Sequence, residues 1–244
     1  MQDQPIGPVL LAFFIAAFLK GITGLGFSTI CLPILTTFID LKTSIPLVIV
    51  PSLSSNVLVM IQAGQFRASL KRFWPLYLSA IPGLVIGVSI LMSVQSTLSR
   101  ALLGGILILY AVWAIRTRVT VLTKWAEVGL APPVGFVTGL VYGMTGSQVM
   151  PIVPFLLSVH LPPDTFVQTI NVSATLSGLI MLGLLGRVGL LSGSMIGTAV
   201  LGMIPVALGI FMGGRLRRKL PEEAFRNLVL LFLILMGLTL LLGI

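Results

Sequence analysis

The sequence predicts an all-α protein that crosses a membrane several times, built from two inverted repeats, each a broken re-entrant helix hairpin plus three transmembrane helices. Hydrophobic residues make up 57% of the 244 residues and charged residues only 9%, whereas about 25% of a typical soluble domain is charged. Apolar stretches long enough to span a bilayer follow one another along the chain. Two over-long stretches, one in each half, share a glycine-rich pattern.

The apolar stretches define the predicted elements in order. A single helical crossing needs about 20 apolar residues, and six of the stretches have roughly that length. The other two exceed 30 residues, and glycines near their middles indicate either two half-helices folded back as a hairpin or one steeply tilted helix. The predicted order is hairpin 6–39, spans 43–63, 75–96 and 99–115, hairpin 128–159, and spans 165–186, 188–214 and 227–244.

The two over-long segments resemble each other. The first runs from Phe18 through a Gly/Ser/Thr cluster to Pro33, and the second runs from Phe136 through a similar cluster to Pro151. Equivalent positions lie 118 residues apart, which is close to half the chain. Such a repeat predicts an internal duplication. The predicted repeats are residues 1–120 and 121–244.

The positions of lysine and arginine favour inverted halves. If both long segments cross once, the predicted loops place seven basic residues on each side of the membrane. If both are hairpins, eleven basic residues fall on one side and three on the other, with Lys20 inside the membrane. Cytoplasmic loops are enriched in Lys and Arg. We therefore predict hairpins, inverted halves, and both termini on the outer face of the cytoplasmic membrane.

Inverted repeats with broken helices are typical of secondary transporters, which hold the substrate near the bilayer midplane between discontinuous helices. Irregular backbone is tolerated at that depth only where it lines a cavity or is buried in protein. The sequence therefore predicts a secondary transporter. A passive channel and a non-transporting scaffold subunit stay open as alternatives.

At the two glycine-rich segments the chain resembles the TauE/SafE family of sulfite and organosulfur anion transporters, which carries one such segment in each half. The matching positions are Gly21, Gly24, Gly26 and Pro33 in the first copy and Gly139, Gly143 and Gly146 in the second. The resemblance implies transport of a small anion such as sulfite, a sulfonate or a related organosulfur or carboxylate anion. It also implies coupling to an ion gradient, such as that of H⁺ or Na⁺.

The two clusters supply most of the predicted substrate site. A helix that starts at a chain break has free backbone N–H groups, and helix N-termini bind oxyanions. Glycine lets the backbone approach the ligand, and hydroxyl and amide side chains add hydrogen-bond donors. The predicted substrate-binding residues are Lys20, Gly24, Gly26, Ser28, Thr29, Asn56, Gly143, Thr145, Gly146, Ser147, Gln148 and Asn171.

The alternative interpretation of small residues is close helix packing. We assign that role to the glycine pairs Gly83/Gly87, Gly193/Gly197 and Gly209/Gly213.

Lys20 is the only charged residue well inside a predicted membrane segment. A cation at the bilayer centre costs about 2.5–3.5 kcal/mol on insertion scales, so we expect it to pair with the anion. The alternative is that its side chain extends to the interface. Asn56 and Asn171 either contact the ligand or cap the broken backbone.

The remaining polar residues give no sign of catalysis. Cys31 and His160 are the only residues of their types, so no cysteine- or histidine-rich metal site can form. His160, Asp164 and Asp40 either carry protons or are ordinary interfacial residues, and the second interpretation is favoured. We expect no enzymatic activity and no cofactor, metal or nucleic acid. The expected partners are the lipid bilayer, the anionic substrate and a coupling ion.

Overall fold

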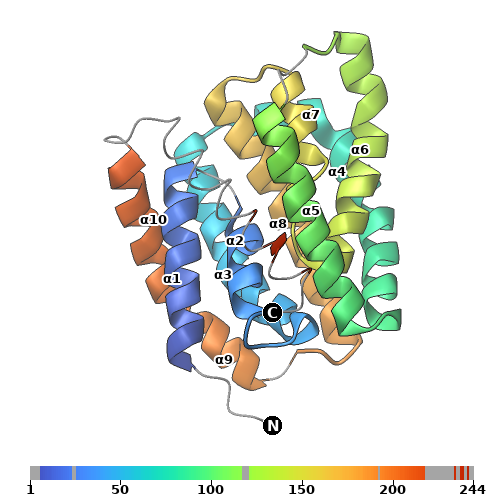
Figure 1. Cartoon of the computed structure of the whole chain (residues 1–244). Coiled ribbons are helices and arrows are strands. Elements are labelled where there is room, and N and C mark those ends of the chain that lie inside the picture. The colour runs from blue at the N-terminus through green and yellow to red at the C-terminus, as the bar shows by residue number, and fades with distance from the viewer. Residues whose placement is uncertain are drawn as a thin grey trace.

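The computed structural model describes residues 6–23, 26–116, 121–191 and 193–217, together with residues 234, 237–238 and 241. These residues form helices and contain no strand (Figure 1). The predicted span 227–244 lies almost wholly outside the described residues. The helices are α1 (Ile6–Thr23), α2 (Phe27–Leu35), α3 (Leu41–Ala63), α4 (Phe66–Ser93), α5 (Ser96–Arg116), α6 (Lys124–Thr145), α7 (Ile152–Ser158), α8 (Pro163–Arg187), α9 (Gly193–Leu201) and α10 (Met203–Arg217).

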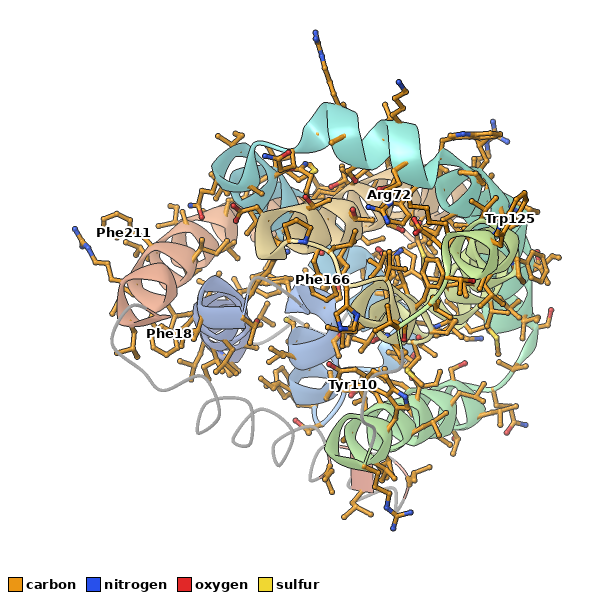
Figure 2. All side chains as sticks on the ribbon, turned by 90° about the horizontal axis from the view of Figure 1, so that it is seen from above. Phe18, Arg72, Tyr110, Trp125, Phe166 and Phe211 are labelled. Carbon is orange, nitrogen blue, oxygen red and sulfur yellow. The ribbon has the colours of Figure 1, made fainter. Side chains whose placement is uncertain are left out.

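Six helical stretches of the described chain are long and apolar enough to cross a membrane: α1, α3, α4, α6, α8, and the α9–α10 stretch Met195–Leu216. Their outer faces carry exposed apolar side chains, such as Leu11, Leu208 and Phe211. In Figure 2, Phe211 and Trp125 lie at opposite edges of the bundle. Such a surface suits lipid rather than water, and the predicted all-helical membrane protein is confirmed.

Both over-long segments are broken at their glycine clusters. The first divides into α1, with 18 residues, and α2, with nine. The second divides into α6, with 22 residues, and α7, with seven. Gly26 and Gly146 adopt the left-handed conformation at these breaks, with φ of 79° and 70°. Because α1 and α6 are long enough to cross a membrane alone, each segment has one long and one short arm rather than two half-helices.

The helix boundaries differ most from the prediction at two places. α4 begins at Phe66 rather than at residue 75, because the cations Arg67, Lys71 and Arg72 lower the hydropathy of turns that are still helical. The predicted span 188–214 is divided at Gly202 into α9 and α10. A Cβ atom on Gly202 would lie 2.4 Å from the Phe13 ring, so the aromatic side chain packs into this break.

Two helix pairs pack backbone against backbone through glycine. In the α4–α6 pair, a Cβ on Gly139 would lie 2.0 Å from the Ala80 carbonyl oxygen, and one on Gly87 would lie 2.3 Å from that of Leu140. In the α1–α10 pair, a Cβ on Gly213 would lie 2.1 Å from the Phe18 carbonyl oxygen. Helices α3 and α8 lie between these pairs (Figure 1).

The predicted packing role of GxxxG glycines can be checked at all three pairs. It is confirmed at Gly83/Gly87 and Gly209/Gly213, where an added Cβ would lie within 3 Å of the facing helix backbone. No described atom lies within 4 Å of a Cβ on Gly193 or Gly197, so the described contacts do not support that pair.

We predict that Gly139→Ala lowers the midpoint of thermal unfolding, because the new methyl group must push α4 and α6 apart. Overpacking of this kind costs about 1–3 kcal/mol. Gly129→Ala is a matched control on the same helix, since no atom lies within 4 Å of its Cβ position and alanine favours the helix by about 1 kcal/mol. Equal midpoints for the two variants would contradict the backbone contact.

Candidate functional site

A cavity of about 110 Å³ lies between the two chain breaks, and both halves of the chain line it. The first half contributes residues of α1, α2, α3 and α5, and the second half contributes α6, α7, α8 and the loop before α7. No aspartate or glutamate of the described chain lines this space. The lining residues are Lys20, Thr23, Gly26, Phe27, Ser28, Thr29, Ile30, Ser52, Asn56, Tyr110, Tyr142, Gln148, Val149, Val153, Ile170, Asn171 and Ala174.

Lys20 is buried, with 2% of its surface exposed, so its ammonium group does not reach an interface. Its Nζ donates a hydrogen bond to Ser55 Oγ at 3.0 Å and another to Asn56 Oδ1. The ion pair within the described chain joins Arg72 to Glu127, and Lys20 has no carboxylate partner there. The cavity is therefore lined by a buried basic side chain whose partners among the described residues are neutral oxygen atoms.

Lys20 fixes the orientation of Asn56. An ammonium group can only donate hydrogen bonds, so Asn56 must turn its carbonyl oxygen toward Lys20. The amide nitrogen of Asn56 then points elsewhere, and it is buried without a hydrogen-bond partner among the described residues. Because Asn56 lines the cavity, its NH₂ group is a donor available to an oxygen atom placed there.

Gln148 presents a second amide to the cavity. Its Nε2 donates to Ser173 Oγ at 2.7 Å, and its Oε1 has no partner among the described residues. A rotation of the amide by 180° would let the Ser173 hydroxyl donate to Oε1 and would free the NH₂ group, because both groups can donate and accept. Gln148 can therefore offer either an acceptor or a donor to a ligand.

A pair of hydroxyl groups joins the two breaks. Thr29 at the start of α2 and Ser147 after α6 are hydrogen bonded through their side-chain oxygens at 2.9 Å. These residues are 118 positions apart, which is the spacing between the two glycine-rich segments. A second pair, Ser28 and Ser52, is hydrogen bonded at 3.1 Å and lines the cavity.

The start of α2 faces the cavity. This helix begins after Gly26, no side chain caps it, and residues 26–30 line the space. The first N–H groups of a helix have no partner within the helix, and they carry its positive dipole end. Helix α7 contributes only Val153 and has seven residues. The sequence predicts two helix starts that face the substrate. The start of α2 faces the cavity, whereas α7 contributes one apolar side chain.

Most of the predicted site residues meet at this cavity. Those that line it are Lys20, Gly26, Ser28, Thr29, Asn56, Gln148 and Asn171. Gly24 lies outside the described residues.

Four predicted residues of the second cluster do not line the cavity. Gly143 packs against the backbone of α4 at Gly87. Thr145 is hydrogen bonded to the Val141 carbonyl and to the backbone N–H of Ser147. Gly146 ends α6. Ser147 is hydrogen bonded to Thr29, and of these two residues Thr29 lines the cavity. These residues shape the second break, whereas those of the first cluster face the space itself.

Sequence reasoning missed the aromatic and hydroxyl residues Tyr110, Tyr142 and Ser52. Ser52 precedes Asn56 by four residues on α3, and helix periodicity places such residues on one face, so this signal could have found it. Tyr142 lies 118 positions after Gly24, inside the second glycine-rich segment. Tyr110 lies in an ordinary apolar helix, where nothing in the sequence marks it.

The acidic and histidine residues after the breaks lie away from the cavity. Asp40 caps α3, because its carboxylate accepts a hydrogen bond from the Lys42 backbone N–H at 3.0 Å. His160 is exposed with a φ of 51° after α7, and Asp164 is in the first turn of α8. None of the three lines the cavity, as expected for interfacial residues.

The family model described as sulfite exporter TauE/SafE matches residues 9–240, which is nearly the whole chain. The chain belongs to the TauE/SafE family. TauE/SafE proteins are transporters, and this member has the apolar helices of a multi-pass membrane protein. No curated protein and no solved structure matches it.

We predict that Gly146→Ala lowers the thermal unfolding midpoint more than Gly26→Ala does. Both positions have positive φ, which costs a residue with a Cβ about 1–2 kcal/mol. A Cβ on Gly146 would also lie 2.7 Å from Leu32 Cδ1, whereas one on Gly26 would have its nearest neighbour at 3.7 Å. Thermal unfolding of both variants in detergent checks this order, and an equal loss would show that packing at Gly146 is not tight.

Proposed function

We propose that the chain is a secondary transporter that carries a small anion across the cytoplasmic membrane and binds it in the cavity beside Lys20. The observation that carries this proposal is the buried ammonium group without a carboxylate partner among the described residues. Membership of a transporter family supports it. A gradient of H⁺ or Na⁺ is the proposed driving force.

The sign of the substrate follows from charge. Burying an ion that has no counter-charge is costly, and an anion in the cavity would supply that counter-charge. At an effective dielectric constant of about 20, a charge pair at 4 Å is worth roughly 4 kcal/mol before desolvation. A neutral sugar would gain none of this energy, and a cation would be repelled.

The size of the cavity limits the substrate. Pockets for drug-sized ligands measure about 300–1,000 Å³, and this cavity measures about 110 Å³. That volume suits sulfite, a short sulfonate or a small carboxylate. The Asn56 amide nitrogen, the start of α2 and the Ser28 and Thr29 hydroxyls are the proposed donors to its oxygen atoms.

We also propose that the two halves are inverted repeats and that both termini lie outside. The charge distribution supports this, and so does the packing. The long arm of each broken segment packs through glycine against the second predicted span of the other half: α1 against α10, and α6 against α4. The hydrogen bond between Thr29 and Ser147 joins positions separated by the repeat distance. Such a two-fold arrangement would permit alternating access around a central site.

We predict that Lys20→Gln weakens sulfite binding by about tenfold, because it keeps a polar side chain but removes the charge. Losing a third of a pair energy of roughly 4 kcal/mol gives that factor. Asn56→Asp should weaken sulfite binding at least as much, because its carboxylate would pair with Lys20 and neutralise the charge in the cavity. The same ion pair should leave the protein folded. Calorimetry measures the affinity, and sulfite counterflow in proteoliposomes measures carrier activity.

Lys124→Gln is the matched control, since Lys124 is exposed at the start of α6 and its loss should leave binding unchanged. Lys20→Arg should retain part of the activity, because it keeps the charge on a planar group that fits less well. Unchanged affinity in folded Lys20→Gln and Asn56→Asp proteins would refute the cation site. A parent protein that conducts the anion without counterflow would be a channel.

A reporter that is active only in the cytoplasm should be silent when it is fused to the C-terminus. The physical reason is the excess of basic residues that the inverted arrangement places inside. The same reporter inserted at residue 64, between α3 and α4, should be active. Strong activity of the C-terminal fusion with full-length protein in the membrane would overturn the inverted arrangement.

A further inference from the structure

The first turns of α4 are not needed to cross the bilayer. This helix has 28 residues and a kink at Phe73, where φ is −111° and ψ is 18°. Pro75 cannot donate a hydrogen bond to the carbonyl of Lys71, which accounts for the kink. The part of the helix from Pro75 to Ser93 rises about 28 Å, close to the thickness of the hydrocarbon core, about 30 Å.

When the molecule is viewed from above, the first part of α4, up to the kink, lies along one edge of the bundle (Figure 2). We refer to residues 66–74 as the interfacial segment.

The interfacial segment has three distinct faces. Its inner face carries Ser69 and Phe73, which are fully buried. A second face carries the exposed apolar side chains of Phe66, Leu70 and Trp74. The third face carries Arg67 and Lys71, which are also exposed. At about 100° per residue the apolar and basic faces are neighbours. This arrangement is typical of a helix in the boundary between lipid headgroups and acyl chains.

Hydrogen bonds on the inner face hold the segment in place. Ser69 Oγ is bonded to Tyr77 OH at 2.7 Å and to Thr169 Oγ1 of α8 at 2.9 Å. Near the other end, Arg72 forms a two-pronged ion pair with Glu127 of α6, at 2.6 and 2.8 Å. The orientation of the outward faces is therefore fixed by the protein.

The two outward cations have no counter-charge within the described chain. Glu127 is paired with Arg72, and no carboxylate of the described residues forms an ion pair with Arg67 or Lys71. Side chains four residues apart on a helix have Cβ atoms about 6 Å apart, so both can contact one phosphate group. Arginine binds phosphate oxygens in pairs, and lysine adds a point charge.

We propose that the interfacial segment binds the headgroup of an anionic phospholipid through Arg67 and Lys71. Phe66, Leu70 and Trp74 then contact the adjoining acyl chains. A soluble phosphate would use the two cations but would leave the apolar face in water. A lipid satisfies both faces at once, because its charge and its hydrocarbon lie side by side. Each basic residue near an anionic membrane surface contributes about fivefold to the affinity.

Fluorescence of Trp74 tests this proposal in the full-length protein, reconstituted with a mixture of phosphatidylcholine and phosphatidylglycerol. Trp113→Phe and Trp125→Phe leave Trp74 as the only tryptophan. Bromine atoms on the acyl chains of either lipid quench a tryptophan that they touch. We expect brominated phosphatidylglycerol to quench Trp74 more strongly than brominated phosphatidylcholine at equal content. R67Q/K71Q should abolish this preference, with a loss of about fivefold in affinity per cation.

The matched control is R116Q/K124Q, which removes two exposed cations at the end of α5 and the start of α6 and should keep the preference. High salt should remove the preference reversibly in the Trp74-only protein that keeps Arg67 and Lys71, because exposed charges are screened. This measurement does not depend on the folding of R67Q/K71Q. Equal quenching by both lipids would overturn the proposal, and so would an equal loss of preference in R116Q/K124Q. Weak quenching by both lipids would place the segment outside the acyl boundary and would also overturn it.

Discussion

The buried ammonium group of Lys20 is the constraint around which the cavity is organised. An ion within the membrane must find partners, because lipid offers none. Lys20 obtains two of them from adjacent residues of α3, Ser55 and Asn56. These hydrogen bonds orient the Asn56 amide but bring no carboxylate to Lys20. The cavity therefore combines a buried basic group with hydrogen-bond donors already aimed into it, and in the proposed function this arrangement lowers the cost of ordering the site when an anion binds.

Glycine provides the scaffold that holds this site between the two breaks. In the α1–α10 and α4–α6 pairs the backbones are so close that no side chain separates them. Such contacts leave little room for sliding, because any displacement meets main-chain atoms. Around the cavity the contacts are made by side chains, which can change rotamer. The molecule thus combines two helix pairs in direct backbone contact with a centre, formed by α2, α3, α7 and α8, whose contacts are made by side chains.

The sequence predicted the membrane class, the two breaks and seven of the residues that line the cavity, because apolar length and glycine clusters are local signals. It could not distinguish a glycine that approaches a ligand from one that packs on a helix. Gly26 and Gly143 belong to matching motifs, yet only Gly26 lines the cavity. Hydropathy measures average apolarity rather than direction, so it also missed the start of α4, where cations lie beside exposed apolar side chains. Tyr110 reaches the cavity through tertiary packing alone.

The hydroxyl pair of Thr29 and Ser147 is a direct polar contact between the two breaks. Either oxygen can donate the proton, so the bond can reverse its direction without moving a heavy atom. A neutral hydrogen bond of this kind contributes only about 1 kcal/mol, since water can replace each partner. This bond is therefore a weak contact at the centre of the molecule, and the glycine contacts of the α1–α10 and α4–α6 pairs lie on either side of it.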